Sequence, residues 1–210
     1  MRFKLYMFGR THIAVGVATS VAILRPDTIP ELTAAVAGGA FGGWFCDIDL
    51  KKDYIGDGIH QDFIWLLIIL IISITTDFLF GEGTCKYLTT HWNIWSMICS
   101  LLFFVISLII FFFAEHKGFS HSILGIILLS ALFEIACKPV APAFAIGIIS
   151  HVLIDLLTIR GLMLFFPFRI RISLGLCKSG GKVNTFLLIA GTTASFIMII
   201  WFLTRILFKQ

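Results

Sequence analysis

Residues 183–204 read VNTFLLIAGTTASFIMIIWFLT, an apolar stretch without a charged side chain. A helix needs roughly 20 apolar residues to cross about 30 Å of hydrocarbon. Two other stretches, 63–80 and 94–114, are almost free of charge and rich in Ile, Leu and Phe. We expect all three to be transmembrane helices, with 183–204 the C-terminal one. They decide the fold class, which is an integral membrane protein built from helices.

The composition of the whole chain agrees with this class. Hydrophobic residues make up 59% and charged residues 13% of 210 residues, and the mean hydropathy is +1.00. Disorder and a coiled coil are excluded. The five cysteines form no Cys-x-x-Cys pair, so we interpret them as packing residues rather than disulfides or metal ligands. The net charge of +4 comes from short loops beside apolar runs, so no nucleic-acid partner is expected.

Four shorter apolar stretches, 12–24, 32–45, 119–136 and 141–157, either span the membrane or pack inside. The second contains four glycines among alanines, which lets neighbouring helices approach closely and predicts an interior helix. The expected architecture is an all-α polytopic membrane bundle of about seven helices. We expect residues 1–210 to form a single membrane domain.

Lysine and arginine predict the orientation of this bundle. If seven helices alternate across the bilayer, eleven of the 16 basic residues fall on one side and five on the other. The positive-inside rule then places the N-terminus and the basic loop 160–182 in the cytoplasm. Arg2, Lys4 and Arg10 before a short apolar run also resemble a signal peptide. No A-x-A cleavage site follows, so we favour a retained helix in a bacterial inner membrane.

Histidines and aspartates gather at one level in this topology. Ionisable groups in membrane helices are expensive, so each one suggests a functional site. The residues that reach the cytoplasmic level are His12, Asp47, Asp49, His116, His121, His151 and Asp155.

The spacing of these residues suggests how they meet. His151 and Asp155 are four residues apart, so they share one helix face, and Gly147 one turn earlier is expected to leave space beside them. His116 and His121 are five apart and would diverge on a continuous helix. They converge if the chain turns between them, which we expect at Gly118 in the sequence His116-Lys117-Gly118-Phe119-Ser120-His121, with Ser120 capping the next helix.

Asp47 and Asp49 alternate about Ile48, so in an extended segment both carboxylates would face the same way and one could bridge two metals. Nitrogen and oxygen donors without a thiolate suit zinc, or alternatively manganese. All seven residues are candidate metal ligands, and two or more ions are expected. All of them except His12 are also candidate catalytic residues, because paired metals favour phosphoester hydrolysis.

Other polar residues fit simpler interpretations. We interpret His60 and His91 as packing or interfacial residues, and we expect Asp77 and Glu134 near the external side. The basic loop 160–182 is interpreted as a topology determinant that contacts lipid headgroups, with docking of a phosphate substrate as the alternative. Its Phe-rich stretch, residues 165–168, is interpreted as an interfacial anchor.

Four motifs occur in order along the chain: Thr11-His12, Asp47-Ile48-Asp49, the stretch from His116 to Ser122, and Gly147 through Ser150-His151, Asp155, Thr158 and Gly161 to Pro167. Together they resemble the YdjM-like family of LexA-regulated, membrane-bound metal-dependent hydrolases. The match covers about residues 11–168, which would be the metal-binding core. The resemblance implies a distant similarity to zinc-dependent phospholipase C and the fungal single-strand nucleases. Those enzymes bind zinc through clustered His and Asp on helices, here expected at one end of the bundle.

The chain departs from the family pattern at three positions. Cys46 stands where Pro is usual, Lys117 where Arg is usual, and Leu50 replaces the His that follows the second Asp. If that His is a ligand in relatives, this chain lacks one. Only His60 or a rearranged ligand shell could then substitute.

The leading hypothesis is a metal-dependent hydrolase of phosphoesters, such as phospholipid or lipid-linked phosphate, at the cytoplasmic face of the membrane. The alternative is a transporter or channel in which the same His and Asp line a cation path, with polar residues at successive depths. A third interpretation is an interaction or stress-response protein whose metal site is structural, which predicts a closed coordination shell without bound water. The sequence leaves the substrate, the ion and the oligomeric state open.

Overall fold

The computed structural model describes residues 9–49, 71, 75, 83–90, 92–113, 118–178 and 181–208. Within these ranges the fold is all-α, with no β-strand beyond two isolated bridges. The α-helices are α1 (Gly9–Leu24), α2 (Ile29–Phe45), α4 (Thr84–Thr89), α5 (Ile94–Phe113), α6 (Ile123–Ala136), α7 (Ala141–Leu156) and α8 (Lys182–Phe208). Two 3-10 turns, η1 (Cys46–Asp49) and η3 (Phe119–His121), complete the order.

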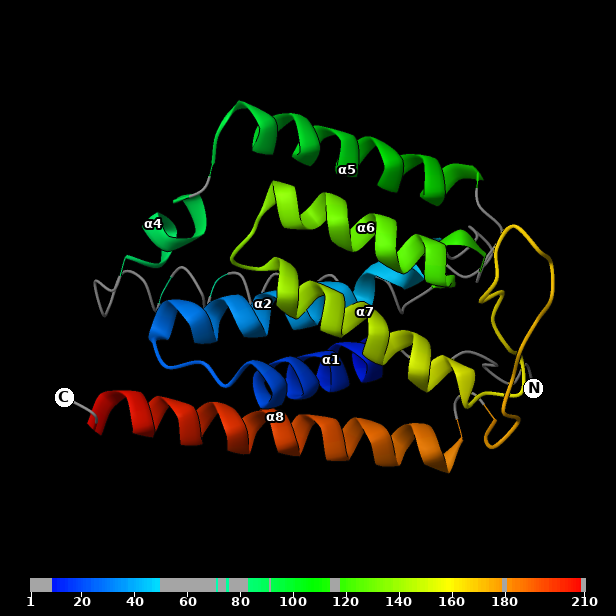
Figure 1. Cartoon of the computed structure of the whole chain (residues 1–210). Coiled ribbons are helices and arrows are strands. Elements are labelled where there is room, and N and C mark those ends of the chain that lie inside the picture. The colour runs from blue at the N-terminus through cyan, green and yellow to red at the C-terminus, as the bar shows by residue number, and fades with distance from the viewer. Residues whose placement is uncertain are drawn as a thin grey trace.

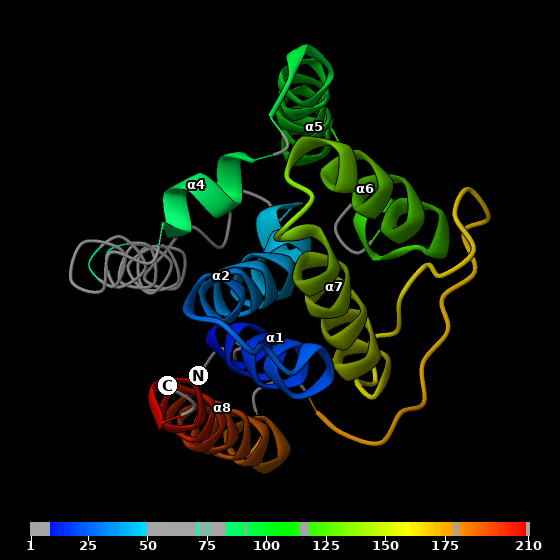
Figure 2. The ribbon, with the colours of Figure 1, turned by 60° about the vertical axis from the view of Figure 1, so that its left-hand side comes forward.

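Helices α1, α2 and α7 form the centre of the bundle. Each of the three contacts the other two, α8 packs against α1, and α5 packs against α6 (Figures 1 and 2). Phe103 of α5 also contacts Phe45 of α2 and Phe144 of α7. Most of α2 is buried, as its small residues predict. A Cβ on Gly147 of α7 would lie 2.6 Å from the carbonyl oxygen of Gly39. The prediction of free space beside Gly147 is therefore wrong, because the α2 backbone occupies that position.

Helix α8 extends the predicted span 183–204 at both ends to 27 residues. Among the described residues it is the one helix long and apolar enough to cross a membrane. Helix α5 corresponds to the predicted stretch 94–114. The stretch 63–80 lies outside the described residues apart from Ile71 and Thr75. A polytopic arrangement stays a prediction.

Several helices meet at one end of the bundle. There α1, α6 and α8 begin, α2 and α7 end, and the segment 157–178 runs beside them (Figure 1). That segment carries Arg160, Arg169, Arg171 and Lys178. At the opposite end, Arg205 of α8 forms an ion pair of 3.1 Å with Asp27, between α1 and α2. The basic segment and the ends of the ligand-bearing helices thus share one end of the bundle.

Candidate metal centre

Five of the seven predicted ligands converge at this end. His12 comes from the first turn of α1, Asp47 from η1, His121 from η3, and His151 and Asp155 from the last two turns of α7. The Asp155 carboxylate lies 3.6 Å from Nε2 of His12 and 3.8 Å from Nε2 of both other histidines. Asp155 and the three histidines are at most 2% exposed. The site is therefore a buried cluster of imidazoles around a carboxylate.

The spacing of the donor atoms fits a bound cation. Nε2 of His151 lies 3.7 Å from Oδ1 of Asp47 and 3.2 Å from Nε2 of His121. Nitrogen–oxygen separations of 3.6–3.8 Å are too long for good hydrogen bonds. They are close to the roughly 3.4 Å that separates two donors on a tetrahedral ion with bonds of about 2.1 Å. The donor set of three imidazoles and two carboxylates suits zinc.

Hydrogen bonds behind the rings orient two of the histidines. Nδ1 of His151 donates to the carbonyl oxygen of Gly43 at 2.7 Å. A carbonyl can only accept, so the proton sits on Nδ1 and the Nε2 lone pair faces the cluster. The Ser120 hydroxyl lies 3.0 Å from Nδ1 of His121 and can accept its proton. Both Nε2 atoms are thus prepared to bind a cation.

Contacts with α8 and α2 position helix α1 so that His12 reaches the cluster. Thr11, its neighbour in the first motif, donates its hydroxyl proton to Oδ1 of Asn184 in α8 at 2.9 Å, and both residues are buried. On the other side, α1 lies so close to α2 that a Cβ at Gly43 would collide with the His12 carbonyl oxygen. The His12 ring then stacks on His151, with centroids 3.8 Å apart.

The segment that follows α7 is fixed beside Asp155. Thr158, a residue of the fourth motif, donates its hydroxyl proton to the Asp155 carbonyl oxygen at 2.7 Å. Burial raises the pKa of the nearby Cys177 thiol, and the negative charge of Asp155 raises it further. Cys177 is therefore a neutral thiol beside the cluster rather than a thiolate.

Sequence reasoning missed Cys46. Its thiol is buried, donates to the Ser120 carbonyl oxygen at 3.3 Å, and lies with His121 and His151 in a group whose donor atoms are within 4.8 Å of one another. The expectation that every cysteine serves only packing is too narrow for this residue. Its position directly before Asp47 was the available signal.

Two expected local conformations are wrong. The Asp47-Ile48-Asp49 segment is a 3-10 turn that continues α2, not an extended strand. The extended backbone that the prediction of parallel carboxylates required is therefore not formed at these residues. The Asp49 side chain lies outside the described part of the chain, as does all of His116.

The cap of α6 also differs from the expectation. Ser122, with extended backbone, accepts a hydrogen bond from the Gly125 N–H at 3.0 Å and is the N-cap of the helix. Ser120 lies one 3-10 turn earlier and contacts His121 instead. The residue that caps α6 is therefore Ser122, two residues after the predicted Ser120, and the 3-10 turn Phe119–His121 directly follows Gly118.

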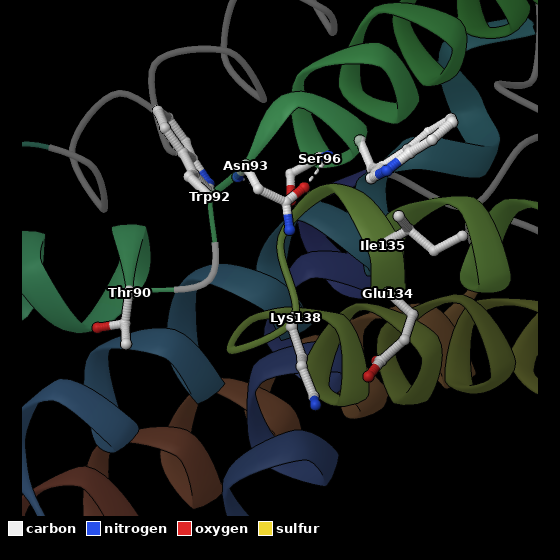
Figure 3. Close-up of a pocket in the computed structure, with 8 residues that line it drawn as sticks. Thr90, Trp92, Asn93, Ser96, Glu134, Ile135 and Lys138 are labelled. Carbon is white, nitrogen blue, oxygen red and sulfur yellow. Dashed lines mark hydrogen bonds between the residues drawn. The ribbon is translucent and has the colours of Figure 1, made fainter.

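The opposite end of the bundle holds a pocket of about 590 Å³ that contains none of these ligands (Figure 3). Its walls include Trp95 in the first turn of α5 and Glu134 in the last turn of α6, with Trp92 just before α5 and Lys138 just after α6. Glu134 thus lies away from the cluster, as the alternating topology predicts. The other histidines and Asp77 lie outside the described residues.

The sequence model of the family described as YdjM inner membrane protein matches residues 7–209. The chain belongs to the YdjM family. The family description places it at the inner membrane, which is consistent with α8.

Among individual curated proteins, the chain is 32% identical over 80 residues to the uncharacterized protein YvsG of Bacillus subtilis (strain 168). The alignment covers 37% of this YdjM-family chain and 50% of YvsG, so the chain spans about half the length of that curated relative. No solved structure matches the chain.

Proposed function

We propose that this protein is a metal-dependent hydrolase of phosphoesters, embedded in the inner membrane as a polytopic bundle with its metal centre on the cytoplasmic side. The observation that carries the proposal is the convergence of His12, Asp47, His121, His151 and Asp155 on one buried point. They come from four separate elements, so the fold itself builds the cluster.

The cluster would hold zinc, with manganese as the alternative. Nε2 of the three histidines and the Asp155 carboxylate would bind the ion, and Cys46 lies close enough to complete a second group. When bound, a divalent cation supplies Lewis acidity toward a phosphoryl oxygen and acidifies water. A shell of several carboxylates and imidazoles with room for a second ion is the arrangement that phosphoester hydrolysis uses.

Asp47 is suited to a proton-transfer role. Its side chain is 11% exposed, against 3% for that of Asp155, so it stands at the edge of the cluster that water can reach. From there it can orient an attacking water and accept its proton. Asp155 is surrounded by imidazoles, so its carboxylate is suited to binding the cation rather than to accepting a proton.

The positions of the charged residues favour an enzyme over a cation path. In the described helices α1, α2 and α5 to α8, every charged residue and histidine lies within the first or last two turns. A transporter or channel needs polar groups at successive depths. We therefore keep transport as the alternative and the hydrolase as the proposal.

The experiment is a phosphoester screen on the purified full chain in detergent or nanodiscs, after chelation and after return of zinc or manganese. We expect metal-dependent cleavage that His151→Gln abolishes. Glu134→Gln, a carboxylate change at the opposite end of the bundle, should leave activity intact. Activity that survives both chelation and His151→Gln on a substrate cleaved by the wild type would exclude this metal centre.

A further inference from the structure

The segment 157–178 between α7 and α8 is attached to the elements that carry the ligands. The Leu174 N–H donates to the carbonyl oxygen of Leu156 at 2.9 Å, at the end of α7. The Ile123 N–H, at the start of α6, donates to the carbonyl oxygen of Leu164 at 3.0 Å. The segment therefore borders both Asp155 and His121 and forms part of the rim of the candidate metal centre (Figures 1 and 2).

Within this segment the chain folds back on itself and presents an apolar tip. Leu162 and Ile172 exchange two backbone hydrogen bonds of 2.9 Å, and the residues between them form the tip. Phe165 is 52% and Phe168 67% exposed, and the neighbouring Phe166 packs edge-on against Phe119. The tip is therefore fixed to the bundle while two of its phenylalanines face outward.

The charge of the segment is of one sign. The sequence contains no Asp or Glu after Asp155, whereas 157–178 contains Arg160, Arg169, Arg171 and Lys178. Arg171 and Lys178 are exposed. Elements that insert at the surface of an anionic membrane typically combine exposed apolar side chains with neighbouring cationic side chains.

The start of α8 indicates where the segment 157–178 lies relative to the membrane surface. Helix α8, which is long enough to cross the bilayer, begins at Lys182, only four residues after Lys178. The chain must therefore be at the membrane surface there, and backbone hydrogen bonds hold the rest of the segment at the same end of the bundle.

We propose that 157–178 is a membrane-docking element, which inserts Phe165 and Phe168 into an anionic leaflet and holds the metal centre at the level of the lipid headgroups. This rests on the membrane insertion of α8. It also rests on the proposed hydrolase function for its consequence, which is that the substrate phosphate belongs to a lipid of that leaflet rather than to a soluble metabolite.

A fluorescence experiment tests the docking without any need for metal or activity. The full chain with Phe168→Trp is placed in nanodiscs of phosphatidylcholine and phosphatidylglycerol whose acyl chains carry bromine. The fluorescence quenching of the wild type, which comes from its five native tryptophans, is measured in the same nanodiscs and subtracted from that of the variant. Ile189→Trp, an exposed position on α8, is the control for a buried-in-lipid tryptophan. We expect quenching within twofold of that control and protection from aqueous acrylamide.

The charged residues give the second arm. In nanodiscs of phosphatidylcholine alone, or when Arg171→Gln and Lys178→Gln are added to the Phe168→Trp chain, bromine quenching of the introduced tryptophan should fall at least twofold. Quenching by acrylamide but not by brominated lipid would overturn the proposal. Protection from both quenchers, together with cross-linking between chains, would also overturn it by making a second copy the occupant.

An activity arm separates this inference from the proposed function. Phe165→Ser/Phe168→Ser should reduce cleavage of a bilayer-resident phospholipid at least tenfold, through KM, while cleavage of a water-soluble phosphodiester and metal content stay unchanged. Equal loss on both substrates would contradict docking. If no phosphoester is cleaved by the wild type, the proposed function fails but the fluorescence result still decides the docking.

Discussion

Nδ1 of His151 donates a hydrogen bond of 2.7 Å to the carbonyl oxygen of Gly43. This contact joins α7 to the last turn of α2 and leaves Nε2 of His151 facing two carboxylates and a second imidazole. Gly43 also allows α1 to approach, because any side chain there would collide with the His12 backbone. One glycine therefore positions two of the histidines in the cluster.

Gly43→Ala should disturb the metal centre more than the bundle as a whole. The added Cβ would push α1 away, and with it His12, at a cost of about 1–3 kcal/mol for overpacking. We expect metal affinity to fall at least tenfold, measured by competition with a chelating dye. Gly181→Ala is the control, because its added Cβ would lie 3.2 Å from the Lys178 carbonyl oxygen and would come within 4 Å of none of the cluster residues. Equal affinity of both variants would argue against this role.

The Ser120 hydroxyl should tune His121. Removing a hydrogen-bond partner behind a ligating histidine typically costs about 10–100-fold in metal affinity. We expect Ser120→Ala to show a loss in this range by isothermal titration. Ser130→Ala removes a buried hydroxyl of α6 that has no hydrogen-bond partner among the described residues, so it should change neither affinity nor stability. A similar result for both serines would remove Ser120 from the site.

The charge asymmetry makes a prediction about sidedness. Lys178→Cys should be protected from a membrane-impermeant maleimide added to intact cells, and Thr90→Cys, at the opposite end, should be labelled. Both signals are measured above the wild-type background and repeated after permeabilisation. The reversed pattern would invert the protein and place the metal centre on the outer side of the membrane.

The helices and their grouping at one end were predictable from the sequence for a simple reason. Apolar runs fix where helices lie, and in a membrane protein the polar residues between them must lie at the ends. The helical spacing of His151 and Asp155 then placed both on one face, and both side chains do face His121. The positions of His151 and Asp155 on α7 could therefore be predicted from the helical period alone.

The rest of the site depends on contacts that sequence spacing does not contain. The Gly43 carbonyl is a backbone group, so its residue type gave no sign of its bond to His151. The turn at Cys46–Asp49 packs against α5 and η3, which lie far from it in the sequence. Cys46 and Ser120 meet across 74 residues of sequence, which only the tertiary fold brings together.

The cluster is expected to bind a divalent cation, and the metal content of the purified full chain is the measurement that decides this. Plasma mass spectrometry should find at least one zinc or manganese per chain in the wild type and in Glu134→Gln. Asp155→Asn keeps the side-chain size but removes the charge that three imidazoles face, so it should lose most of the metal while retaining the wild-type helical circular dichroism. A wild type without divalent metal after purification in its presence, or an Asp155→Asn variant with full metal content, would contradict the account.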